Sequence, residues 1–212
     1  MSLLVLRKFA QALLVLLATA ALLAACAGAS AERSPRELLR LAVSGLSAPE
    51  SYRFALTETG SPRQENWTGE VRRHDGLRLL GAADGAPART GDGIRIGGED
   101  SYNPSALLEG LLDQAASVRL DEARSDGDEA VLMIEPDASR AAALWSKRLS
   151  AEGKRLSPGR PLQAAGMSYE LIVDRHRLVP VELTERSRLL FSAGEGRSEE
   201  ERTLRFRFDT KP

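Results

Sequence analysis

The chain has 212 residues, a length that predicts one domain or at most two small ones. Its 29 Lys and Arg nearly balance 30 Asp and Glu, so the formal charge of -1 argues against the basic footprint of a nucleic-acid-binding protein. One cysteine and two histidines exclude an intramolecular disulfide framework and a Cys-rich zinc site. With 42% hydrophobic and 28% charged residues, the composition is that of a globular protein.

The first 25 residues are predicted to be a signal peptide. Arg7 and Lys8 form a short positive region, and residues 9–25 are almost entirely apolar. This apolar run is shorter than the roughly 20 residues that a membrane-spanning helix needs, and it ends in small residues. The segment then continues into Leu23-Ala24-Ala25-Cys26.

That tetrapeptide resembles the lipobox of bacterial lipoproteins. In this family a diacylglyceryl group is attached to the cysteine thiol, and the signal peptide is cut immediately before it. The resemblance implies that Cys26 is lipidated and that acyl chains such as palmitate anchor the chain at the extracytoplasmic face of the cell membrane, or at the outer membrane where one exists. An ordinary signal peptide cut nearby and an uncleaved anchor helix stay open as alternatives.

Cleavage before Cys26 divides the chain into three predicted parts. Removal of residues 1–25 takes away two basic residues and no acidic one, so the formal charge falls to -3. Residues 26–33 are then a lipidated N-terminus with a small, polar tether, and residues 34–212 form a single domain.

The domain is predicted to begin with a helix and a set of strands. Ser34, Pro35 and Glu37 form a capping box for a helix that ends near residues 46–48. Alternating residues predict strands at 52–57 and 67–72, and Asp75-Gly76 predicts a two-residue type I′ turn into a strand over 77–80. A loop over residues 81–93 and a short strand at 94–96 follow.

Helices and strands alternate in the rest of the chain. Asn103-Pro104 opens a predicted helix over 104–116, a hairpin spans 118–135, and Asp137 caps a helix over 138–151 with Trp145 facing inward. Residues 154–165 are predicted to be a basic exposed loop. The last third is predicted to be a meander with strands near residues 167–173, 178–191 and 204–208, in which Pro180 marks an edge or a strand start.

These elements predict an α+β fold of about nine strands and three helices. The links between consecutive strands have hairpin length or hold a single helix, which favours an antiparallel sheet. Several strands alternate apolar with charged residues, so one face of the sheet is expected to be buried and the other wet.

Two segments add a second resemblance. The stretch of residues 38–46 leading to Tyr52-Arg53-Phe54, and the stretch of residues 169–174 followed by residues 178–183, resemble the LolA/LolB-like and LppX/LprG-like envelope lipoproteins. This resemblance implies a half-open barrel with helices on its concave face that holds acyl chains or another apolar molecule. The residues expected to line such a cavity are Tyr52, Phe54, Trp67, Tyr169, Leu171, Leu204, Phe206 and Phe208. The same periodicity is equally typical of a packed core.

No motif of catalytic, metal or cofactor chemistry is present in the sequence. His74 and His176 each lie beside a predicted turn, so both are expected at the surface. The sequence therefore predicts a non-enzymatic protein whose partners are the membrane, through its N-terminal lipid, and a lipid or other apolar ligand. The alternative is a structural or regulatory module without a ligand cavity, which contacts another envelope protein through a sheet edge or the 81–93 loop.

Overall fold

The strands of this protein join into one antiparallel sheet, which a computed structural model describes over residues 33–60, 63–72, 76–82, 103–151, 162–193 and 196–209. The chain divides into two units, Met1–Ser34 and Pro35–Pro212, and the second unit holds all the described helices and strands. Residues 1–32, including Cys26, lie outside the described residues. So do residues 83–102, which hold most of the predicted 81–93 loop and the predicted strand at 94–96.

Eight described strands follow one another across the sheet in the order β3-β2-β1-β8-β7-β6-β5-β4. Their bounds are β1 Ser51–Gly60, β2 Arg63–Arg72, β3 Gly76–Ala82, β4 Ala115–Leu120, β5 Glu129–Pro136, β6 Leu162–Asp174, β7 Val179–Ala193 and β8 Gly196–Asp209. Every neighbouring pair is antiparallel. The sheet is not closed, because β3 and β4 stand at its two ends.

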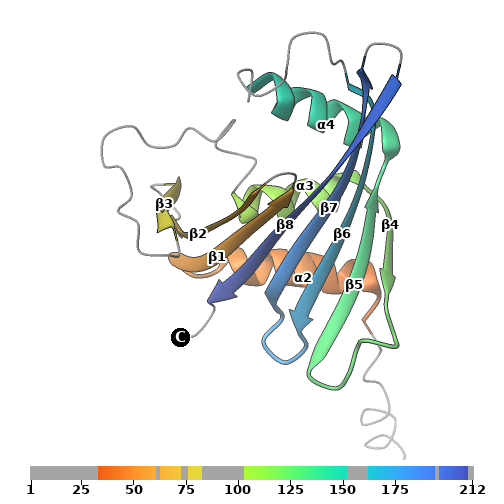
Figure 1. Cartoon of the computed structure of the whole chain (residues 1–212). Helices are drawn as coiled ribbons and strands as arrows, with labels where there is room; N and C mark the ends of the chain where they lie inside the picture. Colours follow the sequence, from red (N-terminus) through yellow and green to blue (C-terminus); the bar gives the residue numbers. More distant parts are fainter. Residues whose placement is uncertain are drawn as a thin grey trace, which may run out of the picture. The chain divides into compact units, whose positions relative to one another are not determined.

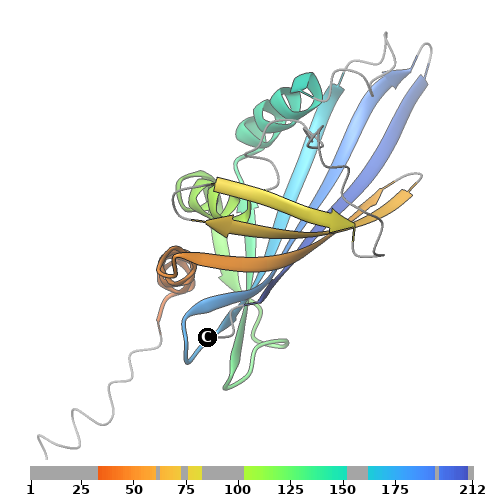
Figure 2. The same cartoon turned by 90° about the vertical axis from the view of Figure 1, so that its left-hand side faces the viewer.

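Three helices lie on one side of this sheet, the side toward which β1, β2 and β3 curve (Figure 2). They are α2 Pro35–Ser47, α3 Pro104–Gln114 and α4 Ala138–Ala151, and Figure 1 shows α4 across the far ends of β6, β7 and β8. The prediction of an α+β fold with a curved, half-open antiparallel sheet and helices on its concave face is confirmed. Eight strands are described where about nine were expected.

Register shifts and a glycine accommodate the curvature. The pairing shifts register at four places in the sheet, one of them between Thr68 and Gly69 on β2. Gly69 lies opposite Phe54, and an added Cβ at Gly69 would come within 2.3 Å of the Phe54 ring. Because Gly69 has no side chain, the ring of Phe54 can lie over β2 at this position.

Helix α2 is amphipathic and packs closely on the sheet. Its buried residues are Leu38, Leu39, Ala42, Val43 and Leu46. A Cβ at Gly45 would come within 2.3 Å of the carbonyl oxygen of Leu178, in the turn between β6 and β7. Leu178 itself has φ of 55°, a left-handed conformation that ends this turn. Glycine at position 45 is thus needed for the helix to approach the turn.

Helix α3 has the predicted N-terminus and a shorter C-terminus. The Asn103 side chain accepts hydrogen bonds from the backbone N–H groups of Ser105 and Ala106, at 3.1 and 3.5 Å. The helix ends at Gln114, two residues before the predicted end, because β4 begins directly at Ala115. The Arg36 guanidinium of α2 donates a hydrogen bond of 3.0 Å to the carbonyl of Ala115 at this junction.

Two sequence predictions are wrong in their details. Arg72 pairs with Gly76, so residues 73–75 connect β2 to β3 in place of a two-residue type I′ turn at Asp75-Gly76. Gly76 has φ of 75°, a conformation that glycine adopts without strain. Residues 162–165 are strand and not loop, since β7 extends to Ala193 and supplies them with backbone partners.

Pro180 lies at the second position of an internal strand. It faces Val173 of β6 at a register shift, and β8 pairs with β7 only from Glu182 onward. The missing N–H of proline therefore removes no bond from the β7–β8 ladder. The prediction of a strand start is confirmed, and the prediction of an edge is not.

Candidate functional site

The eight predicted cavity-lining residues lie together on the concave face. Tyr52, Phe54, Trp67, Tyr169, Leu171, Leu204, Phe206 and Phe208 are all at most 9% exposed and belong to one apolar cluster, the main cluster. Leu39 of α2 and Leu108 of α3 are buried in the same cluster. The described side chains thus form a packed core here, and the lining of a cavity by these residues stays a prediction.

Aromatic rings join the first and last strands within this cluster. The Tyr52 and Phe208 ring centroids are 6.1 Å apart, and those of Phe54 and Phe206 are 5.8 Å apart, both pairs being tilted. The Tyr52 hydroxyl lies 2.5 Å from the Ser105 hydroxyl on α3. Burial raises the pKa of Tyr52 to about 12, and the hydrogen bond to Ser105 opposes that rise only in part.

A second, smaller cluster lies farther along the same strands. It consists of Trp145 from α4, Ala165 from β6, and Leu189 and Phe191 from β7. The inward orientation predicted for Trp145 is confirmed, because it is 3% exposed. Met167 packs against both clusters and stays partly exposed, which makes it the apolar link between them.

Polar side chains separate the two clusters on the concave face of β7. Glu185 is 1% exposed and Ser187 is 4% exposed, and the Ser187 hydroxyl donates a 3.2 Å hydrogen bond to Glu185 Oε1. Glu185 is paired across the sheet with Tyr169 and with Leu204, both of which face the main cluster. A carboxylate buried on this face is unusual, because desolvation penalises its charge.

The neighbouring strands continue this polar stretch. Arg202 of β8 faces Ser187 across the sheet, and its guanidinium carbon lies 5.5 Å from the centre of the Trp145 ring. Arg202 is also 3.8 Å from the Glu200 carboxylate. Glu58 of β1 lies opposite Leu204, on the same face. We call the set Glu58, Glu185, Ser187, Glu200 and Arg202 the inner polar band.

The inner polar band was not predicted from the sequence, although a signal for it exists. Glu185 and Ser187 have the same alternation along the chain as Leu183 before them and Leu189 after them. Side chains two residues apart on a strand share a face. Their polarity breaks an otherwise apolar row, and that break was the signal.

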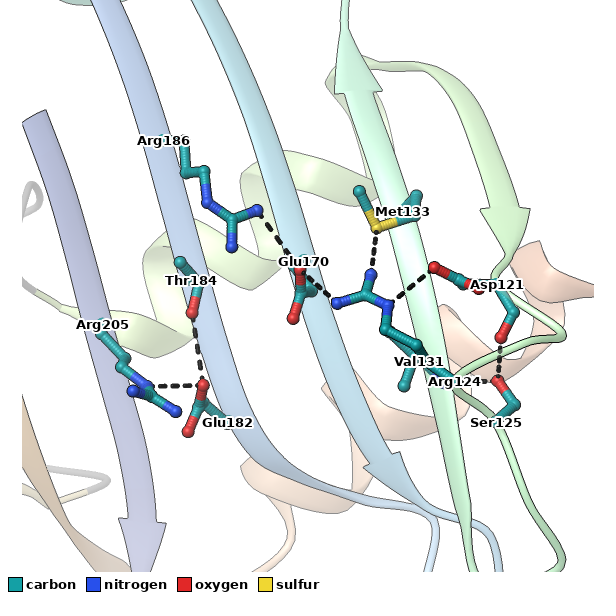
Figure 3. Close-up of polar contacts among 10 residues, drawn as sticks. All are labelled: Asp121, Arg124, Ser125, Val131, Met133, Glu170, Glu182, Thr184, Arg186 and Arg205. Carbon is teal, nitrogen blue, oxygen red and sulfur yellow. Dashed lines mark hydrogen bonds and ion pairs between the residues drawn. The ribbon is translucent and has the colours of Figure 1, made fainter. Parts of the chain in front are cut away.

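The opposite, convex face carries a network of arginines and carboxylates (Figure 3). Glu170 is 8% exposed, and its carboxylate forms ion pairs with Arg124 at 3.0 Å and with Arg186 at 3.2 Å. Arg124 also donates from Nε to Asp121 at 2.7 Å and from Nη2 to the Met133 sulfur at 3.2 Å. The network thus reaches from β7 across β6 to the turn between β4 and β5.

A second carboxylate on the convex face joins β7 to β8. Glu182 is 9% exposed and contacts Arg205 at 2.6 Å and Arg207 at 3.2 Å. Burial opposes ionisation of Glu182, but the two guanidinium groups outweigh it and hold the pKa of this carboxyl below its ordinary value. Each charged group in these contacts pairs with a group of opposite charge on another strand or turn. The convex network therefore serves to stabilise the sheet.

The turn between β4 and β5 shows no ion-binding arrangement. The Asp126 carboxylate accepts backbone N–H groups from Glu129 and Asp128, at 2.7 and 2.8 Å, and these bonds lower its pKa. His176, at the surface as predicted, contacts Asp128 at 3.0 Å, while His74 lies outside the described residues. Within the described ranges, no group of three or more His, Cys, Asp or Glu residues is arranged to hold a metal ion.

Comparison with known proteins adds no assignment, since no family model and no curated protein matches this chain. Among the helices of the described residues, none is long and apolar enough to cross a membrane. The candidate site is therefore defined by its own residues, namely the two apolar clusters, the inner polar band between them, and Met167.

Proposed function

We propose that this protein is a lipid-anchored, non-enzymatic binding protein of the extracytoplasmic membrane face, whose half-open barrel holds a lipid or other apolar ligand. The observation that carries the ligand part is Met167, which stays partly exposed between two buried apolar clusters on the concave face. A partly exposed apolar side chain that packs against both buried clusters offers contact to an apolar molecule. The anchor part rests on the lipobox-like Leu23-Ala24-Ala25-Cys26.

The anchor is tested by Cys26→Ala. We expect the wild-type chain in the membrane fraction, cut before Cys26 and carrying incorporated radiolabelled palmitate, and the variant without label and not cut before residue 26, because that cut follows lipidation. A variant that is processed normally and stays in the membrane fraction would contradict lipid anchoring through Cys26.

The ligand is tested on the unit Pro35–Pro212, which has its own core. We expect native mass spectrometry of the gently purified unit to detect a non-covalent lipid, and the neutral fluorophore N-phenyl-1-naphthylamine to bind with enhanced emission. Met167→Asp places a charge between the two clusters, so it is expected to weaken fluorophore binding by about tenfold or more.

Ser168→Asp is the matched control. Ser168 is the next residue on β6, is also partly buried, and lies on the convex face because side chains alternate. Equal fluorophore binding by both variants, or no bound lipid and no fluorophore binding in the wild type, would refute the ligand proposal. A crosslinked envelope protein with no bound lipid would favour the interaction module.

A further inference from the structure

We propose that residues 162–168 of β6, which we call the β6 edge, are a docking surface for the same edge of a second copy of this chain. The two edges pair as antiparallel strands, so that the sheet of one copy continues into the sheet of the other. This inference does not rest on the proposed function, because the pairing requires no bound ligand.

The β6 edge has a neighbouring strand on one side only. β7 pairs with β6 from Leu162 to Asp174, whereas β5 pairs with β6 only from Tyr169 onward. β5 ends at Pro136, where the chain leaves the sheet and continues into α4, and β6, β7 and β8 extend past it (Figure 1). No described strand therefore lies beside the β6 edge on the β5 side. Backbone N–H and C=O groups that point to that side can pair with a further strand.

The β6 edge has no charged residue, whereas the other long edges of the described sheet do. Its sequence is Leu-Gln-Ala-Ala-Gly-Met-Ser. Arg78 lies on the β3 edge, Arg119 lies on the β4 edge, and three glutamates at 199–201 lie on the part of β8 that extends past β1. Charged side chains are a common means by which proteins prevent pairing between exposed edges. The β6 edge lacks this protection, which favours pairing there.

The occupant that fits the β6 edge is the same segment of a second copy. When two copies pair antiparallel about a two-fold axis at Ala165, residue 162 of one copy lies opposite residue 168 of the other, and no like charges meet along the pair. Each edge then continues the line of β5 beyond Pro136 of the other copy. The β6 edge is thus complementary to itself in charge, direction and length.

Position 166 is suited to testing this pairing. Gly166 is exposed and lies one residue from the two-fold axis. The nearest atom to a Cβ added there is Cβ of Arg188, at 4.0 Å, which is ordinary van der Waals contact. A side chain at position 166 is therefore accommodated within one copy, and its effect on association reports on the contact between copies.

The experiment is sedimentation velocity on the unit Pro35–Pro212 over a series of concentrations. We expect the wild-type unit to show a reversible equilibrium between monomer and dimer. Gly166→Asp places one carboxylate from each copy beside the axis, so it is expected to raise the dissociation constant of the dimer at least about tenfold. Gly166→Lys should do the same. An equimolar mixture of the two variants should associate more tightly than either variant alone, because opposite charges then lie together.

Gly166→Ala is the matched control. It adds the Cβ without a charge, so the dissociation constant should stay within about threefold of the wild-type value. A wild-type unit that stays monomeric throughout the series overturns this inference, and so does equal weakening by Gly166→Asp and Gly166→Ala or a mixture that associates no better than its components. Absence of bound lipid or fluorophore contradicts the proposed function alone. Circular dichroism confirms that each variant is folded.

Discussion

Single residues determine how closely the strands and helices approach one another. Gly69 leaves room for the Phe54 ring, and an added Cβ would lie 2.3 Å from it. We expect Gly69→Ala to lower the free energy of unfolding by about 1–3 kcal/mol, as overpacking does in closely packed cores. Urea denaturation followed by circular dichroism measures this change.

The control for this substitution is Gly127→Ala, since a Cβ at Gly127 meets nothing within 4 Å. It should change stability by no more than about 0.5 kcal/mol. The loss of stability in Gly69→Ala should be smaller when Phe54 is also replaced by Leu, because the smaller side chain would relieve the clash with the added Cβ. Additive effects of the two substitutions would show that the ring is not the cause.

Tyr52 gives a second prediction at this scale. Its pKa is raised from the ordinary value of 10.0 to about 12, so the protonated form is favoured in the folded state. Its contribution to stability is complete below pH 10 and is lost as the pH rises toward 12. Tyr52→Phe should cost about 1 kcal/mol at pH 7, through the lost bond to Ser105, and should flatten the alkaline decline. An unchanged alkaline profile in denaturant melts would contradict this account.

At the scale of the element, helix α4 depends on its first turn. The Asp137 carboxylate accepts a hydrogen bond from the Ser139 hydroxyl, and backbone bonds from Ser139 at 2.9 Å and Arg140 at 3.4 Å. These bonds, the hydroxyl of Ser139 first, lower the pKa of Asp137. The cap is therefore complete above the ordinary carboxyl pKa of 3.8 and is lost as the pH falls through the lowered value.

We expect Asp137→Ala to increase amide hydrogen exchange in the first turns of α4 several-fold at pH 7, while α2 stays unchanged. Asp137→Asn should retain most of the cap, because asparagine also accepts these bonds. If both variants exchange as the wild type does, the cap does not hold the helix.

The convex network predicts acid sensitivity of the sheet. Glu182 is favoured as the carboxylate in the folded state, so its contribution is present above its ordinary pKa of 4.5 and disappears as the pH falls below it. Glu182→Gln should be less stable than the wild type at pH 7, and the difference should narrow by pH 3. Thermal melts across this range measure it, and a constant difference would contradict the role of the charge.

The sequence predicted elements well where local chemistry decides them. Capping residues such as Asn103 and alternating strands such as β1 and β8 depend on neighbours along the chain, and these predictions hold. The β2–β3 connection and the start of β6 depend on register against distant partners, which no local pattern contains. Within the inner polar band, Glu185 and Ser187 carry a local signal along β7, whereas the contribution of Arg202 depends on the β7–β8 pairing and could not be predicted from any local pattern.

At the scale of the whole molecule, β8 joins the two halves of the sheet. It pairs with β1 on one side and with β7 on the other. Phe206, which is fully buried, lies opposite Leu56 of β1 and Leu183 of β7. Within the described sheet, β8 is therefore the strand through which β1, β2 and β3 connect to β4, β5, β6 and β7.

A chain that ends at Arg202 is therefore expected to lose the cooperative unfolding transition, because it lacks the part of β8 that carries Leu204, Phe206 and Phe208. Phe206→Ala tests the same point in a chain of full length, and it is expected to lower the free energy of unfolding by about 3–5 kcal/mol. Near-ultraviolet circular dichroism reports on both. A shortened chain with native tertiary signals would show that the two halves hold together without this strand.

The position of β8 also determines when the protein can fold during its synthesis. A ribosome makes the chain from its N-terminus, so β1 and β2 emerge long before the strand that joins them to β7. Until then the nascent chain cannot complete the sheet, and its tertiary structure must wait for the last described strand. The half of the sheet made of β1, β2 and β3 therefore has no strand link to β7 until β8 has been synthesised.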